Sequence, residues 1–239
     1  PPPPPCFQAE DGIRDGPQCL VGSEMCIRDR CTHGLWAHGT GMYLIKRHLE
    51  REYGMRALIF NYPSVTKTLD ENAGRLARFI EENGIEQTHL VGHSLGGLVI
   101  LRMLANRYSD VPGRVVCIGS PLRGSRAATI LDAKSWGEHL LGAAVPQGTV
   151  HGSANEWASE VTARRDIGSI AGSVPFGVGH VTGPFGEPND GTVAVAETRL
   201  DGAKDHIVMP TTHTGMLISR NVAEQIGAFL RRGEFLREE

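Results

Sequence analysis

The stretch THLVGHSLGGLVILRMLANRY, residues 88–108, decides the fold of this 239-residue chain. Its first part, THLVGHS, is a short apolar run that predicts a buried strand leading into a turn, and LGGLVILRMLANRY predicts a nearly all-apolar helix. Between them lies GHSLG, residues 92–96, which matches the pattern Gly-x-Ser-x-Gly. The bare pattern is weak evidence in a chain with 30 glycines, so its place between a strand and a helix is what makes it informative.

Ser94, in the middle of this turn, is the candidate nucleophile. A sharp turn holds such a serine in a strained backbone conformation, and small residues at positions 92 and 96 let the strand and the helix approach without a clash. The hydroxyl is then held above the end of the sheet, beside helix N–H groups that favour developing negative charge. Because serine is a poor nucleophile near neutral pH, this role requires a neighbouring base.

Segments on both sides of this stretch alternate between helical and strand patterns, which predicts a mostly parallel sheet flanked by helices. The expected helices cover 41–54, 69–84 and 215–232, and the expected strands cover 55–63, 114–121, 166–174 and 205–210. Over residues 126–175 the alternation weakens, and we expect a small cap or lid-like insertion there. No internal repeat or linker divides the rest, so we predict one domain over residues 32–239.

His213 is the candidate base among ten histidines. Where a serine lies on such a turn, the chain order runs nucleophile, acid, histidine, and the histidine follows the last strand. His213 comes directly after the expected strand 205–210 and before the closing helix. His93, next to the serine, is interpreted as a packing residue or one that supports the site indirectly.

The acid must lie between Ser94 and His213 in the chain. The candidates are Asp190, Asp201 and Asp205, with Glu187 and Glu197 behind them. Asp205 begins the strand 205–210, so the rise of a strand separates it from the other end by roughly 16 Å, and Asp201 lies farther still along the chain. Asp190 lies in a Gly/Pro-rich turn, at the edge where the catalytic loops of parallel sheets gather. We therefore predict Asp190 as the acid.

Two backbone N–H groups are expected to form an oxyanion hole. Leu95, directly after the nucleophile, provides one of them. The His-Gly pair in THGLWAHGTG, residues 32–41, predicts the second donor at Leu35, with Trp36 as the alternative. Trp36 and Met216 are also candidates for an apolar pocket that would hold an acyl or alkyl group.

Three motifs together resemble the α/β-hydrolase superfamily, and more narrowly its lipases and esterases with the acid in an Asn-Asp-Gly turn. They are GHSLGG (92–97), PNDGTV (188–193) and HTG (213–215), and the resemblance spans about residues 32–235. It implies an α/β-hydrolase fold and a Ser-His-Asp enzyme that cleaves carboxylic esters through an acyl-enzyme, without metal or organic cofactor. A long-chain lipase or acyl thioesterase, and a non-catalytic or truncated protein of this fold, stay as alternatives.

Composition narrows the classes of partner. The net charge of −3 and the scattered Lys and Arg give no basic patch for nucleic acid. The longest apolar runs are far shorter than the roughly 18 residues of a membrane-spanning helix. Small neutral or weakly polar substrates fit this composition, the resemblance implies that the substrate is an ester, and no oligomeric state is indicated.

Residues 1–31 differ in character from the rest of the chain. The segments FQAEDGIRDG and CLVGSEMCIRDR resemble translated sequencing-adapter DNA, which is found fused to gene fragments from metagenomic assemblies. We therefore interpret residues 1–31 as non-native. An apolar strand should precede the His-Gly loop, whereas EMCIRDRCT stands there, so we expect the first core strand to be missing or replaced. Without a native N-terminus, cytoplasmic location is only the default expectation.

Overall fold

The computed structural model describes residues 28–32, 39–85, 87–108, 112–126, 128–129, 153–176 and 186–237. Within them lies a six-stranded, all-parallel sheet of order β2-β1-β3-β4-β5-β6, which confirms the predicted fold class. The strands are β1 (Arg28–Thr32), β2 (Arg56–Phe60), β3 (Leu90–His93), β4 (Val115–Ile118), β5 (Ile167–Gly172) and β6 (Asp205–Met209). The helices are α1 (Tyr43–Tyr53), α2 (Leu69–Glu82), α3 (Leu95–Ala105), α6 (Ala154–Trp157), α7 (Ser159–Arg164) and α9 (Arg220–Arg232), with 3-10 turns η1 (Gly39–Met42), η3 (Ala196–Thr198) and η4 (Gly215–Leu217).

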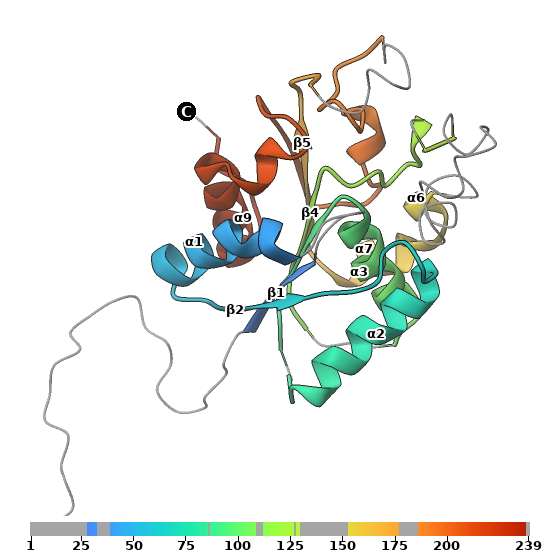
Figure 1. The fold of residues 1–239 in the computed structure, drawn as a ribbon, viewed down its shortest axis with the longest axis vertical. Helices are drawn as coiled ribbons and strands as arrows, with labels where there is room; N and C mark the ends of the chain where they lie inside the picture. The colour runs from blue at the N-terminus through green and yellow to red at the C-terminus, as the bar shows by residue number, and fades with distance from the viewer. Residues whose placement is uncertain are drawn as a thin grey trace, which may run out of the picture.

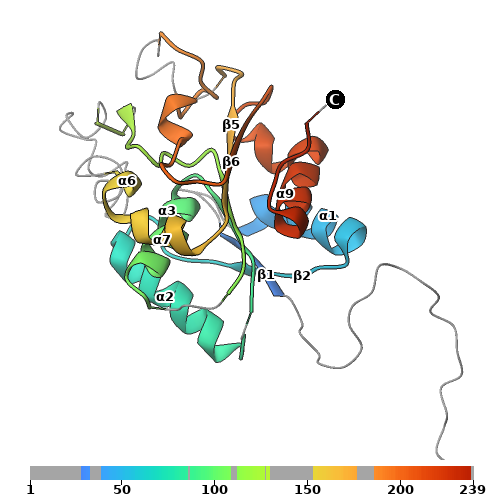
Figure 2. The ribbon, with the colours of Figure 1, turned by 180° about the vertical axis from the view of Figure 1, so that it is seen from behind.

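Helices cover both faces of the sheet, α1 and α9 on one face and α2, α3, α6 and α7 on the other (Figure 1 and Figure 2). Successive residues of a strand point to opposite faces, so a central strand must be apolar throughout. In β4, Val115 and Cys117 pack into the core under α2 and α3, whereas Val116 and Ile118 pack into the core under α1 and α9. The run RVVCIG is therefore a strand buried on both faces.

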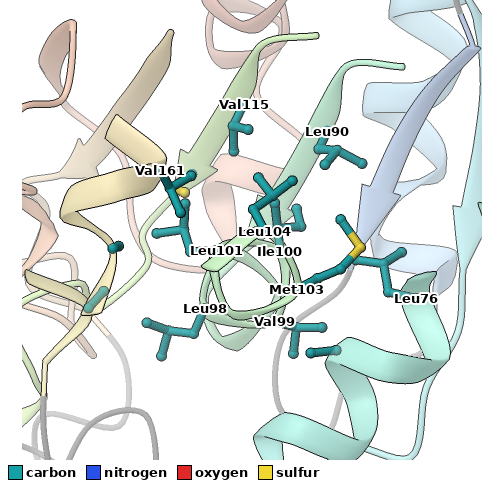
Figure 3. Close-up of a cluster of buried hydrophobic side chains, with 14 of the residues drawn as sticks. Leu76, Leu90, Leu98, Val99, Ile100, Leu101, Met103, Leu104, Val115 and Val161 are labelled. Atoms are coloured by element: carbon teal, nitrogen blue, oxygen red, sulfur yellow. The ribbon is translucent and has the colours of Figure 1, made fainter. Parts of the chain in front are cut away.

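Helix α3 lies in the middle of the first of these cores. Figure 3 shows its side chains between Val161 of α7 on one side and Leu76 of α2 on the other. Leu98, Ile100 and Leu101 of this helix are fully buried. Because α3 is nearly all apolar, it can be buried on all sides, and this packing holds the start of the helix, next to Ser94, against the core.

The capping residues at two helix starts show where the structure agrees with the sequence prediction and where it differs. Helix α2 begins as expected, with a capping box between Thr68 and Glu71. The single helix expected over 215–232 is instead η4 followed by α9. Ser219 causes the division, because its side chain accepts the Val222 N–H and caps a new helix at this point.

Strand β1 occupies the place of the first core strand. Its backbone pairs with β2 from Arg28↔Arg56 to Thr32↔Phe60, and with β3 from Arg30↔Leu90 to Thr32↔Gly92. Arg28, Asp29 and Arg30 thus stand where an apolar run was expected. A strand is therefore present at this place, and its sequence is RDRCT.

The range 126–175, expected to form a cap, contains strand β5 of the central sheet in its last part. Helices α6 and α7, earlier in this range, pack against α3 and its neighbours. Residues 130–152 lie outside the described part of the chain, so a cap over the site stays a prediction. Across the described helices, none combines the length and apolar character needed to cross a membrane.

Candidate active site

Ser94 lies on the turn between β3 and α3, at the carboxyl end of the sheet. Its backbone has φ 54° and ψ −123°, a conformation that a residue with a side chain adopts only at a cost of about 1–3 kcal/mol. The Ser94 N–H donates to the Ile118 carbonyl at 2.8 Å, which ties the turn to the end of β4. This geometry is the strained turn that the sequence predicted.

Two glycines make the turn possible. A Cβ on Gly92 would lie 2.5 Å from the Gly97 nitrogen and 2.6 Å from the Gly96 carbonyl carbon, so strand and helix meet backbone to backbone. A Cβ on Gly97 would lie 2.3 Å from Ser120 Oγ. The close approach expected at positions 92 and 96 thus involves Gly92 with the Gly96–Gly97 peptide, and Gly97 with the segment after β4.

His213 and Asp190 form a buried pair. The His213 Nδ1 lies 2.7 Å from Asp190 Oδ2, and the His213 N–H donates to the Asp190 carbonyl at 2.9 Å. Asp190 is fully buried, and His213 is 8% exposed. Because the carboxylate accepts the Nδ1 proton, the Nε2 of His213 is left to take a proton from a reacting group.

The loop around Asp190 holds its carboxylate by backbone donors. Asp190 Oδ1 accepts the Thr192 N–H at 2.9 Å and the Val193 N–H at 2.7 Å. One oxygen is thereby satisfied by its own turn, and the other faces the histidine. The Asp-Gly turn therefore also holds the Asp190 carboxylate in place.

The other candidate acids bind elsewhere. Asp201 pairs with Arg123, and Asp205 accepts the Phe235 N–H at 2.8 Å and pairs with Arg237. Glu187 is exposed. Of the candidates, the structure brings Asp190 into contact with His213.

Glu197 links two loops near the site, a role that the sequence did not indicate. Its Oε1 accepts the Arg126 N–H at 2.6 Å and its Oε2 accepts the Ala194 N–H at 2.8 Å, so it joins the Asp190 loop to the segment after β4. Burial raises the pKa of Glu197 above its usual range, and the charges of Glu187 and Asp190 add to this rise, although the two backbone N–H groups oppose it. The sequence offered no signal for this bridge, because its two partners are remote from each other in the chain.

Two further glycines lie against the Asp190–His213 pair. A Cβ on Gly119, which has φ +54°, would lie 3.2 Å from both Asp190 Oδ2 and His213 Nδ1. A Cβ on Gly172 would lie 2.7 Å from Asp190 Cβ. Gly119 directly follows β4 and Gly172 ends β5, and the sequence predicted both strands. Their closeness to Asp190 depends on how the strands are ordered in the sheet.

Two other described histidines are bound as structural groups. The His89 Nδ1 accepts the Arg114 N–H at 2.9 Å, and burial, with the charge of Arg114, lowers the pKa of His89 to about 4. The His206 Nε2 lies 2.9 Å from Thr198 Oγ1, and burial lowers its pKa as well. Neither contact involves Ser94.

The remaining predicted site residues divide into three cases. Leu95 is the first residue of α3, where a helix leaves its N–H groups without intrahelical acceptors. Met216 is fully buried, and its Cε lies 2.7 Å from the place of a Cβ on Gly119, which is also close to Asp190 Oδ2 and His213 Nδ1. Leu35 and Trp36 lie outside the described residues, so the second oxyanion donor and a pocket at Trp36 stay predictions.

Over the described ranges, no cluster of three or more His, Cys, Asp or Glu side chains could hold a metal ion. Cys117 is buried and forms no disulfide, and burial raises the pKa of its thiol to about 12.

Two comparisons with known sequences found matches. A model of the alpha/beta hydrolase family matches residues 31–200. A segment of 51 residues is 45% identical to the dihydrolipoyllysine-residue acetyltransferase component of the acetoin cleaving system of Cupriavidus necator. This match covers 21% of the present chain and 13% of that protein, so it spans only a small part of its relative.

Solved structures share the architecture at low sequence identity. A lipase of Bacillus licheniformis in its mature form superposes with a TM-score of 0.65 and 16% identity, over 88% of this chain and 93% of that one. A metagenomic carboxyl esterase has a TM-score of 0.52 and 17% identity, over 87% and 70% of the two chains. At such identities these structures show the fold, and the family model covers most of the chain. From the matched residues 31–200 and the six-stranded sheet, we conclude that this chain belongs to the α/β hydrolase family.

Proposed function

We propose that this protein is a serine hydrolase that cleaves carboxylic esters through an acyl-enzyme. The observation that carries the proposal is the buried 2.7 Å contact between His213 Nδ1 and Asp190 Oδ2, in a loop that also contacts the residue before Ser94. The strained turn of Ser94 supports it, since such strain persists only where the surrounding structure maintains it. The lipase and the carboxyl esterase of the same fold have names that agree with this function.

The first half of the reaction acylates the serine. Ser94 Oγ attacks the ester carbonyl carbon while its proton passes to His213 Nε2, and the imidazolium is stabilised by the Asp190 carboxylate at Nδ1. The carbonyl oxygen becomes an oxyanion, which the Leu95 N–H at the start of α3 binds together with the expected donor at Leu35 or Trp36. When the ester C–O bond breaks, His213 returns the proton to the departing alcohol.

The second half repeats these steps with water. His213 Nε2 takes a proton from water, the hydroxide attacks the acyl carbon, and the proton returns to Ser94 Oγ as the carboxylic acid leaves. Asp190 can keep the imidazole in one orientation throughout, because its Oδ1 is held by the N–H groups of Thr192 and Val193. Neither half of the reaction uses a group other than these protein residues and water.

Labelling of the serine tests the proposal. A fluorophosphonate probe should form one adduct, which peptide mass spectrometry should locate on Ser94, and the protein should hydrolyse p-nitrophenyl acetate. Ser94→Ala should lose both the label and the turnover. Ser120→Ala is the matched control, because Ser120 is a buried serine after the neighbouring strand β4 and should leave both intact. A Ser94→Ala protein with wild-type turnover would rule out this function.

The same three residues could serve substrates with longer acyl chains or thioesters. Rates on p-nitrophenyl acetate, octanoate and palmitate, and on an acyl thioester, separate an esterase from a lipase or a thioesterase. A protein that neither reacts with the probe nor turns over any of these would be the non-catalytic alternative.

A further inference from the structure

His93 joins the serine turn to the loop of the base. It is the last residue of β3, lies directly before Ser94 and is 4% exposed. Its Nε2 lies 2.9 Å from the backbone carbonyl oxygen of His213. A carbonyl oxygen can only accept, so the Nε2 of His93 must carry the proton that is donated.

The two imidazole rings also touch. Their centroids lie 4.6 Å apart and the ring planes are tilted by 50°. His213 is thus held by both of its backbone polar groups: its N–H donates to the Asp190 carbonyl at 2.9 Å, and its C=O accepts from His93. With the contact of its Nδ1 to Asp190, three hydrogen bonds determine where the ring lies.

The sheet itself does not provide this link. Ser94 follows β3 and His213 follows β6, and β4 and β5 lie between these two strands. The ladder hydrogen bonds therefore connect the nucleophile to the base only through two intervening strands. A direct bond from the residue before Ser94 to the backbone of His213 sets their separation locally.

We propose that His93 is a positioning residue, which holds the base loop, residues 210–214, at the distance from Ser94 that proton transfer requires. This inference rests on the proposed function. A base must lie within hydrogen-bond reach of the hydroxyl it deprotonates, and a displacement near 1 Å can lower the rate about 100-fold. His93 acts through His213 and does not itself exchange a proton with the substrate.

Two substitutions separate the donor from the ring. His93→Phe keeps an aromatic ring against His213 but cannot donate, whereas His93→Gln keeps an N–H donor without the ring. We expect His93→Phe to lower kcat about 10- to 100-fold with KM within about twofold, because the base is displaced while substrate binding is not. His93→Gln should retain kcat to within about fivefold, since its amide still reaches the carbonyl. Wild-type kcat in His93→Phe would overturn the proposal, and so would an equal loss in both variants, which would assign the effect to the ring.

A spectroscopic measurement tests the link without activity. In the wild-type protein labelled with ¹⁵N, long-range imidazole spectra should show His93 protonated at Nε2, with that proton protected from exchange with solvent. A His93 with its proton on Nδ1 alone would overturn the proposal, because its Nε2 could not donate. If the wild-type protein neither hydrolyses esters nor reacts with the fluorophosphonate, the proposed function fails, and the tautomer still decides whether the link exists.

Discussion

Gly172 offers a sharp test of how the acid is held. It is the last residue of β5, and a Cβ there would lie 2.5 Å from the Thr211 carbonyl oxygen and 2.7 Å from Asp190 Cβ. Ordinary van der Waals contact begins at 3.4 Å, so Gly172→Ala requires shifts of about 0.9 Å and 0.7 Å. The first contact is a backbone atom and the second is the root of a side chain, so neither can rotate away. The loops that hold Asp190 and His213 must themselves move.

The size of two effects follows from these shifts. Overpacking of this kind costs about 1–3 kcal/mol of unfolding free energy, which lowers the melting temperature by roughly 2–12 °C for a chain of this size. Movement of Asp190 by most of an ångström also lengthens its 2.7 Å contact with His213 Nδ1. We expect kcat to fall about 100-fold, because the base loses its orientation.

The assay is steady-state hydrolysis of p-nitrophenyl acetate together with a thermal melt. Gly74→Ala is the matched control, because Gly74 lies within α2 and a Cβ there has nothing within 4 Å. Alanine in a helix interior should raise the unfolding free energy by up to about 1 kcal/mol and leave kcat unchanged. A Gly172→Ala protein with wild-type kcat and melting temperature would refute the argument that the close approach of β5 positions the acid.

Three further predictions concern single side chains. Asp190→Asn should lower kcat by about 10⁴-fold, because an amide N–H facing His213 Nδ1 favours the wrong tautomer, and a loss under about tenfold would contradict this role. Hydrogen bonds from Arg102 lower the pKa of Asp70. Its contribution to stability is therefore present above the ordinary Asp pKa of about 4, and it is lost as the pH falls through the lower folded-state pKa. Asp70 is partly exposed, so Asp70→Asn should cost less than about 1 kcal/mol at pH 7 in urea unfolding, and the difference from wild type should vanish in acid; a difference independent of pH would contradict this account. Leu101→Ala, in the buried core of α3, should cost about 2–5 kcal/mol in the same assay, and a cost below about 1 kcal/mol would show that this core repacks.

The sequence by itself determined most of the elements and the identities of the candidate residues. The apolar runs before and after GHSLG predicted β3 and α3, because the side-chain period of a strand or a helix is a local property. The same local signals placed Asp190 in a turn and His213 after the last strand. The match of PNDGTV and HTG to a family pattern added the expectation that the two would meet, and the structure places them 2.7 Å apart.

Only the tertiary structure decided which groups touch across the sheet. His93 and His213 are 120 positions apart, Glu197 binds the N–H of Arg126 71 positions away, and Gly172 lies against Asp190 from a different strand. Neither residue pattern nor spacing encodes such contacts, because they depend on the order of the strands and on which loops meet at their carboxyl ends. The physical reason is that a side chain's local preference sets its own element, whereas the distance between two elements is set by the packing of everything between them.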